Sequence, residues 1–301
     1  LAVAMGNTFQ IPAQLTLSNV TIFSNTASTG SLAASGGGMS IQAVGNSRLD
    51  VAMTNVTVQN NLAGNDFSSN GGGIALNLNG GQATLRQSRI LGNRAARIKT
   101  FLGGPSRGGG IYVGQSENIV VRESRAEYNV AGIEIENSMK ADVYKNVATH
   151  NTGGILIFDL PNLPVQGGHD IRVFDNDVTD NDTANFAPKG NMVAIVPKGM
   201  GIMVMANRNV HVFNNTLSGN GTAHVLIAAY PNEYDDDSYM FVPRGVFVHG
   251  NTYGEGGGAP DGEVGKTISD VSGTPVPDIV WDGVTTIPEY FSWTSAENRV
   301  Y

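Results

Sequence analysis

The hydrophobic residues of this chain recur in short alternating runs, and a similar polar phrase precedes each run. In "NVATHNTGGILIFDLP", two asparagines stand five residues apart and are followed by a glycine pair and alternating apolar residues. The second asparagine of the phrase returns at intervals of 22 to 39 residues. Its positions are Asn25, Asn61, Asn93, Asn129, Asn151, Asn181 and Asn220. This spacing indicates one structural unit with insertions of variable length, rather than a strict helical repeat.

Each unit contains three short runs in which apolar and polar residues alternate, a period that is typical of strands with one buried face. When the units are aligned on the asparagine, the apolar residues fall into columns. The first strand supplies Met39, Ile74, Ile111, Ile133, Ile155, Ile202 and Val225, with a parallel column two residues further on. The second strand supplies Ala83, Ile119, Ala141, Ile171 and Val210, and the third supplies Ile90, Ala126, Ala148, Val178 and Leu217. A single unit cannot bury these faces alone, so the units are expected to stack.

We therefore predict an all-β fold, a single right-handed parallel β-helix with three strands per coil, about seven to nine coils and long loop insertions. Neighbouring coils would lie about 4.8 Å apart, and the asparagines would stack as a ladder of side-chain amides. Residues 1–258 would form the solenoid. Residues 259–301 would form a tail that packs on the solenoid or caps its last coil, whose strand edges are otherwise unpaired.

Two groups of motifs carry a resemblance to known proteins. The runs "GGGIYVGQSENIVVRESRAEYNVAGIEIENS", "NTGGILIFDLPNLPVQGGHDIRVFDND", "NFAPKGN" and "GIMVMA" lie between about residues 108 and 230. They resemble an uncharacterised family of exported bacterial β-helix proteins with a pectate-lyase-like solenoid, which implies fold and export but no chemistry. The runs "NVTIFSNTAS" and "GGGMSI", within residues 15–93, resemble the repeats of bacterial surface and autotransporter-like β-helices. The two resemblances meet near Gly108. The sequence is therefore compatible with a natural chain, with a fusion of two proteins and with an engineered chain.

The bulk composition narrows the range of partners. The chain of 301 residues has 26 acidic and 18 basic side chains and a net charge of −8, which argues against a nucleic-acid partner. A local basic patch can still bind an acidic polysaccharide. There is no cysteine for a disulfide or a thiolate metal site, and no apolar run approaches the ~18 residues of a membrane helix. With the resemblances, these features predict a bacterial protein that is secreted, periplasmic or on the cell surface.

The expected site is the outer face of the first-strand sheet, where carbohydrate-active β-helices usually hold their substrates. Tyr112, Glu134 and Glu136 are expected to point outward from adjacent coils of this sheet. Alternation places the Cα atoms of the two glutamates about 7 Å apart, a spacing that suits a general acid and a general base. With Asp159 nearby, the same carboxylates could hold Ca²⁺. The simpler interpretation is a solvated strand face.

Four insertions flank this face, at residues 94–107, 159–169, 182–199 and 230–244, and loops of this length usually bind or cover something. A lyase, an epimerase or a glycoside hydrolase would need acid–base groups there, and cations would bind the carboxylate of an acidic sugar. The catalytic candidates are Tyr112, Glu134, Glu136, Lys189 and Lys198, and the substrate-binding candidates are Arg97, Lys99, Arg107, Phe158, Asp159, His169 and Tyr230. "RIKT" at residues 97–100 matches a motif of polygalacturonases, but "NTGG" and "NVAG" stand where those enzymes carry catalytic acids.

One feature opposes an open groove on that face. An apolar stripe is expected along it, formed by Leu156, Phe158, Met203, Met205 and Leu226. A patch of this kind should be covered. The insertion "NMVAIVP" and the C-terminal stretch 276–293, which is poor in glycine and rich in aromatic residues, are the candidates to cover it.

Three interpretations of function stay open at this point. The chain is an exported protein that binds or acts on an acidic polysaccharide, a non-catalytic structural or adhesive surface protein, or an accessory binding protein that docks through the apolar stripe. The paired glutamates and the basic loop residues favour the first interpretation. The absence of a complete catalytic set favours the second.

Overall fold

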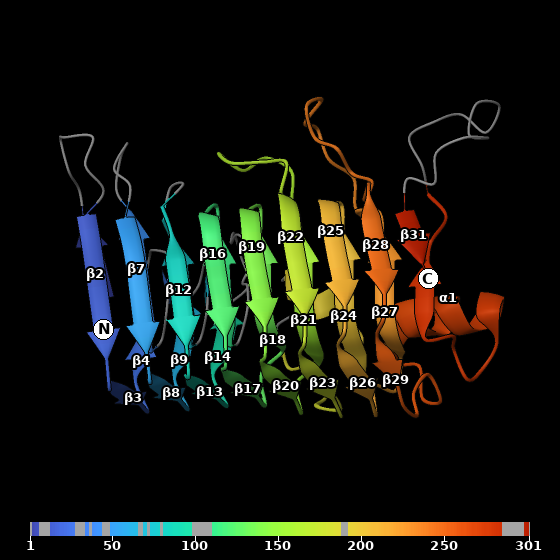
Figure 1. Ribbon diagram of the computed structural model, residues 1–301, viewed down its shortest axis with the longest axis horizontal. Helices are drawn as coiled ribbons and strands as arrows, with labels where there is room; N and C mark the ends of the chain where they lie inside the picture. Colours follow the sequence, from blue (N-terminus) through green and yellow to red (C-terminus); the bar gives the residue numbers. More distant parts are fainter. Residues whose placement is uncertain are drawn as a thin grey trace.

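The computed structural model describes residues 2–5, 13–27, 34–35, 38–43, 49–65, 69–70, 73–78, 81–97, 110–187, 192–284 and 298–300. These residues wind into an elongated stack of parallel strands, with the N-terminal coils at one end and α1 (Gly262–Ser272) at the other (Figure 1). Three long sheets run along the stack. We call them the first-strand, second-strand and third-strand sheets, after the order of the strands in each coil.

All strand pairs in these sheets are parallel, as a β-helix requires. The first-strand sheet contains β1 (Ala2–Met5), β6 (Met39–Ala43), β11 (Ile74–Asn77), β15 (Ile111–Gly114), β18 (Ala131–Glu136), β21 (Gly153–Phe158), β24 (Met200–Met205), β27 (Ala223–Ala228) and β30 (Ile279–Trp281). The second-strand sheet contains β2 (Ala13–Ser18), β7 (Leu49–Thr54), β12 (Ala83–Arg86), β16 (Glu117–Arg122), β19 (Met139–Tyr144), β22 (His169–Phe174), β25 (Arg208–Phe213), β28 (Val246–His249) and β31 (Asn298–Val300). The third-strand sheet contains β3 (Thr21–Phe23), β8 (Thr57–Gln59), β13 (Arg89–Leu91), β17 (Arg125–Glu127), β20 (Val147–Thr149), β23 (Asp177–Thr179), β26 (Thr216–Ser218) and β29 (Thr252–Tyr253). One small sheet contains β4 (Thr26–Ala27), β9 (Leu62–Asn65) and β14 (Arg94–Arg97). Another contains β5 (Ala34–Ser35) and β10 (Ser69–Asn70).

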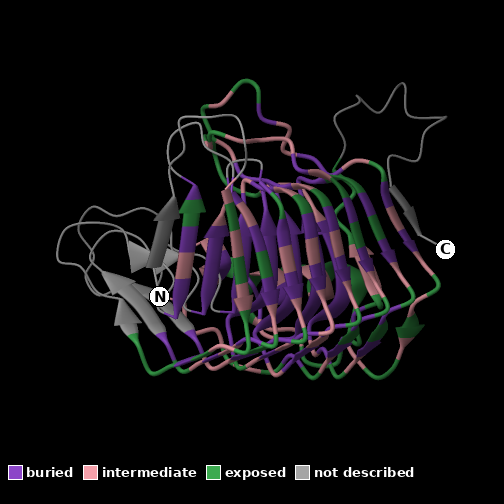
Figure 2. Cartoon of the chain, turned by 60° about the vertical axis from the view of Figure 1, so that its left-hand side comes forward, coloured by how far each residue is buried: buried purple, intermediate pink, exposed green. Residues whose placement is uncertain are grey.

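The core lies inside the solenoid and consists of the predicted apolar columns. Ile111 pairs with Ile133 in the first-strand sheet, and Ala126 pairs with Ala148 in the third-strand sheet. These inward side chains are almost completely buried. Figure 2 shows the resulting alternation as bands of different burial along the strands that face the viewer. The predicted fold is therefore confirmed, because the period-two pattern of each strand determines which side chains point inward.

The anchor asparagines form the predicted ladder along the turn that follows the third strands. Oδ1 of Asn151 accepts hydrogen bonds from the backbone N–H and the side chain of Asn129, both at 3.1 Å. A second ladder, which was not predicted, follows the turn between the second and third strands. It runs through Ser88, Ser124, Asn146, Asn176, Asn215 and Asn251. Both ladders satisfy buried backbone N–H groups at corners where the sheets cannot.

The outer face of the first-strand sheet is covered over β21, β24 and β27 by a second apolar cluster. The predicted stripe is buried in this cluster, namely Leu156, Phe158, Met203, Met205 and Leu226. Val193 of the 3₁₀ helix η1 (Met192–Ile195) and Val196 bury it from the "NMVAIVP" insertion, and Val276 does so from the C-terminal stretch. The prediction of a covered stripe is confirmed, and the stripe is not available as a docking face.

Residues 262–284 lie at the C-terminal end of the stack (Figure 1). Val264 and Ile268 of α1 pack against the second apolar cluster. Directly before the helix, the carboxylate of Asp261 accepts a 3.2 Å hydrogen bond from the backbone N–H of Lys198. β30 then adds to the first-strand sheet beside β27. In the described part of the chain, no helix is long and apolar enough to cross a membrane.

Candidate functional site

Glu134 and Glu136 lie on the outer side of β18, but solvent does not reach them. Both side chains are 0% exposed, and Tyr112 on the neighbouring β15 is also buried. The hydroxyl of Tyr112 donates a 3.0 Å hydrogen bond to Oε1 of Glu136. Gly114 permits this approach, because a Cβ at that position would lie 2.1 Å from the tyrosine oxygen. The expectation that these side chains face solvent is wrong, since the pattern of one strand does not reveal what packs over its outer side.

This burial limits what the three groups can do. A saccharide cannot contact Tyr112, Glu134 or Glu136 in the arrangement observed. Their catalytic roles therefore stay predictions, and each requires the residues over them to move.

Asp159 follows β21 and fastens the loop that leads to β22. Its carboxylate accepts hydrogen bonds from the N–H groups of Gly167 at 2.9 Å and Gly168 at 3.2 Å. Burial raises the pKa of Asp159 to about 6, although these two hydrogen bonds act in the opposite direction. Its carbonyl oxygen accepts a 2.6 Å hydrogen bond from the hydroxyl of Tyr239, in the 230–244 insertion. Asp159 thus holds two insertions together.

The predicted Ca²⁺ ligands do not form a binding site. Among the residues that the structure describes, no group of three or more histidine, aspartate or glutamate side chains is placed to hold a metal ion. Asp159 is engaged by its own loop and Glu136 by Tyr112. In the acidic run 235–237, Asp236 accepts hydrogen bonds from the backbone N–H and the hydroxyl of Ser238. These carboxylates are therefore occupied by structural contacts.

Three further candidates contact their own surroundings rather than a shared cavity. His169, at the start of β22, forms a 2.7 Å hydrogen bond through Nδ1 with the carbonyl oxygen of Gly167. Tyr230 packs edge-on against Tyr239, with ring centroids 5.6 Å apart. The backbone of Lys198 binds the segment before α1, as described above. None of these observations brings the three residues to one face.

The other candidates are buried or lie outside the described residues. Phe158 is buried in the second apolar cluster, next to Glu136 in the register of the sheet. Of Arg97 the structure describes the backbone alone, at the end of β14. Lys99, Arg107 and Lys189 lie outside the described residues.

An open depression lies instead at the corner between the second-strand and third-strand sheets, near β13, β17 and β20 at the lower edge of Figure 1. Its volume is about 360 Å³, and its lining residues are Gln87, Ser88, Arg89, Glu123, Ser124, Arg125, Lys145 and Val147. Arg89 and Arg125 pair in register at the start of β13 and β17, so their Cα atoms are about 4.8 Å apart. The repeated "SR" of "SRILGN" and "SRAEYN" is the sequence signal for this pair.

Cationic side chains from three successive coils line this depression or pair with Glu123 at its edge. They are Arg86, Arg89, Arg122, Arg125 and Lys145. Glu123 accepts hydrogen bonds from Nε of Arg86 at 2.9 Å and Nη1 of Arg122 at 3.1 Å, while Glu127 pairs with Arg125. The hydrogen bond from Arg86, supported by the charges of Arg122 and Lys145, lowers the pKa of Glu123. Five cations and two carboxylates lie on these three coils, and Asp175 and Asp177 lie on the next coil, so the corner keeps a positive balance although the whole chain carries −8.

The turn after each third strand from β3 to β26 has a left-handed backbone, and aromatic residues occupy it in two coils. The residues at this position are Ser24, Asn60, Gly92, Tyr128, His150, Asp180 and Gly219, with φ between 50° and 67°. Glycine, asparagine and aspartate adopt this conformation readily, whereas it costs other residues about 1–2 kcal/mol. Tyr128 therefore stands where glycine or asparagine would fit the backbone with less strain.

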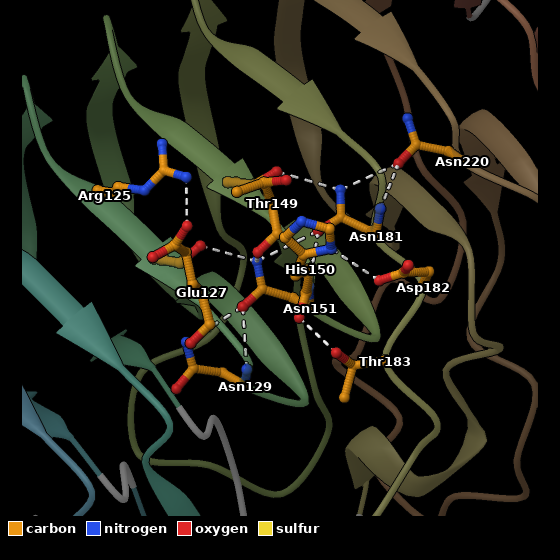
Figure 3. A network of polar contacts seen from close by, with 12 residues as sticks. Arg125, Glu127, Asn129, Thr149, His150, Asn151, Asn181, Asp182, Thr183 and Asn220 are labelled. Atoms are coloured by element: carbon orange, nitrogen blue, oxygen red, sulfur yellow. Dashed lines mark hydrogen bonds and ion pairs between the residues drawn. The ribbon is translucent and has the colours of Figure 1, made fainter.

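The rings of Tyr128 and His150 stack face to face, with centroids 5.4 Å apart and planes within 5°. Asp182 orients the imidazole through a 3.0 Å hydrogen bond between Nδ1 and Oδ1 (Figure 3). Because an ionised carboxylate only accepts, Nδ1 carries a proton and Nε2 of the neutral ring is an acceptor. Tyr128 is 54% exposed, so its ring is open to solvent.

A second aromatic row differs from this pair, because its ring faces are already covered. Tyr144, Phe174, Phe213 and His249 stack on one another at centroid distances of 4.8 to 5.2 Å. Each inner ring uses both faces for its neighbours, so the row stabilises the solenoid and presents ring edges to solvent.

A family model described as "Right handed beta helix region" matches the chain over residues 2–168 and 100–252, two segments that overlap and together span most of its length. The chain belongs to this family. No curated protein and no solved structure gives a match. Membership of the right-handed β-helix family accounts for the solenoid, and the chemistry has to be inferred from the side chains described above.

Proposed function

We propose that this β-helix protein binds an acidic polysaccharide in the depression between the second-strand and third-strand sheets. The supporting observation is the cationic cluster of three successive coils. Within the described residues, Arg89 and Lys145 of this cluster make no ion pair, so both can bind carboxylates of a ligand. Cations that repeat at the coil spacing suit a polymer that carries repeated negative charges.

This proposal places the ligand away from the first-strand sheet. On that sheet the candidate acids are buried and the apolar stripe is covered, whereas the depression is open. The role is therefore one of binding, and lyase, epimerase or hydrolase chemistry at Glu134 and Glu136 stays a separate prediction. An acidic polysaccharide is a ligand of the cell exterior, so the proposal includes a secreted, periplasmic or cell-surface location.

Isothermal titration calorimetry with polygalacturonate, alginate and neutral dextran tests this proposal. We expect the two acidic polymers to bind, and to bind more weakly at high salt, because salt screens exposed charges. Dextran should not bind. Absorbance of unsaturated uronate in the same mixtures separates simple binding from lyase chemistry.

A charge-matched pair of variants tests the location. Arg89→Ala/Lys145→Ala should bind about tenfold more weakly, a loss of about 1.4 kcal/mol. Lys140→Ala/Lys266→Ala removes the same charge at two exposed lysines elsewhere and should bind like the wild type. Equal losses in both double variants would refute the site. No binding of any acidic polymer would favour a structural or adhesive role.

A further inference from the structure

Tyr128 lies at the opposite end of β17 from the depression. Arg125 begins this strand and Tyr128 follows its last residue, which places their Cα atoms about 10 Å apart along the strand. Glu127 lies between them in the chain, and its carboxylate pairs with Arg125 (Figure 3). An extended ligand that leaves the depression along β17 therefore reaches the ring of Tyr128 without crossing an unpaired negative charge.

Among the side chains that the structure describes, none stacks on the second face of the Tyr128 ring. His150 stacks on the face that looks toward the next coil. In the preceding coil the same turn position is Gly92, which has no side chain to cover the other face. Beyond it stands Asn60, whose Oδ1 would lie 2.8 Å from a Cβ at residue 92. Gly92 therefore leaves a slot with the ring of Tyr128 on one side and Oδ1 of Asn60, which leans toward residue 92, on the other.

We propose that this slot holds a pyranose ring stacked on Tyr128, while an acidic unit of the same saccharide lies in the depression. The inference rests on the proposed function and extends it. The C–H face of a pyranose packs against an aromatic ring, and its hydroxyl groups can donate to Oδ1 of Asn60 on the other side of the slot. The ligand is then an acidic oligosaccharide of at least two units that lies along β17, across the axis of the solenoid.

The position of Tyr128 argues for binding rather than stability. Its turn has a left-handed backbone at φ 58°, and asparagine occupies the same place at Asn60 with φ 54°. Asparagine suits this turn without strain. Asp182 fixes the imidazole of His150, so the platform under Tyr128 keeps one orientation.

Three variants of the full chain separate the roles of ring and turn. Tyr128→Asn removes the ring and installs a residue that the turn prefers, so its melting temperature should equal or exceed that of the wild type. It should bind tetragalacturonate about tenfold more weakly, whereas Tyr128→Phe should bind within about twofold of the wild type, since the ring is kept. Phe23→Ala removes a ring that is 62% exposed on β3 of the same sheet, and should bind normally. Galacturonate itself reaches the depression alone and should bind the wild type and Tyr128→Asn equally.

The outcomes distinguish the slot from the proposed function. Unchanged tetrasaccharide affinity in Tyr128→Asn, with a loss in Arg89→Ala/Lys145→Ala, overturns the slot and leaves the acidic site standing. Affinity that depends on Tyr128 but not on Arg89 and Lys145 supports the slot and overturns the acidic site. A lower melting temperature of Tyr128→Asn with normal binding identifies a structural tyrosine and overturns the slot. A wild type that binds neither acidic saccharide overturns both proposals.

Discussion

Replacing Asn151 with alanine tests how the interior of the asparagine ladder holds the solenoid together. The Asn151 amide accepts hydrogen bonds from the backbone N–H and Nδ2 of Asn129, and it donates to the carbonyl oxygens of Ala126 and Thr149 at 2.9 and 3.0 Å. The residue is fully buried, so water does not replace these contacts. Alanine would leave the backbone N–H of Asn129 and the carbonyl of Ala126 without these partners. At about 1–3 kcal/mol for each orphaned group, the free energy of unfolding should fall by roughly 2–6 kcal/mol.

Asn25 provides the matched control at the exposed end of the same ladder. Its side chain donates to Oδ1 of Asn61 at 3.0 Å, and that oxygen keeps the backbone N–H of Asn25 as a donor after substitution. Asn25→Ala should therefore cost less than about 1 kcal/mol. Urea unfolding followed by circular dichroism measures the free energy of unfolding of both variants. The dependence of this free energy on urea concentration must be equal in the two variants, because repeat proteins can unfold in parts. Unfolding free energies of the two variants within about 0.5 kcal/mol of each other would refute the reasoning.

Three further predictions concern single sites. The pKa of Asp159 is about 6 in the folded state and 3.8 ordinarily, so the native state binds more protons than the unfolded state between these pH values. The free energy of unfolding should therefore rise by up to about 3 kcal/mol from pH 7 to pH 4. Thermal unfolding of Asp159→Asn should show no such rise. Gly114→Ala should cost about 1–3 kcal/mol, because its Cβ would meet the oxygen of Tyr112; an unchanged melting temperature would contradict this. Arg172→Ala should lower the free energy of unfolding in urea by less than about 1 kcal/mol, because its 2.6 Å ion pair with Asp142 is exposed. A larger decrease would contradict the interpretation of this contact as an ordinary surface ion pair.

The core and the main ladder could be predicted from the sequence because each obeys a local rule. Alternation along one strand places Ile133 inside and Glu134 outside the solenoid, whatever the neighbouring coils contain. The asparagines recur at one fixed place before the first strand, so their stacking follows from the stacking of the strands. Neither inference needs knowledge of the insertions.

The burial of Glu134 and Glu136 could not be predicted, because it depends on what packs over the sheet. Insertions have no fixed period, so the sequence does not show which outward residues they cover. The depression was missed for a related reason. Arg89, Arg125 and Lys145 are separated by 36 and 20 residues along the chain, and they become neighbours only when the coils are stacked in register.

In a parallel solenoid, equivalent outward residues of successive coils form a column along the surface. A binding site is expected where the type of residue in such a column changes from one coil to the next. The first position of the third strands reads Thr21, Thr57, Arg89, Arg125, Val147, Asp177, Thr216 and Thr252, so arginine occupies two adjacent coils alone. The turn column changes at the same place, where Gly92 precedes Tyr128 and His150. Backbone preference accounts for neither arginine nor tyrosine, because threonine suits the strand and asparagine suits the turn. The two columns depart from these residues together on one coil, that of β17, which carries both Arg125 and Tyr128, and this supports the proposal that one ligand contacts both.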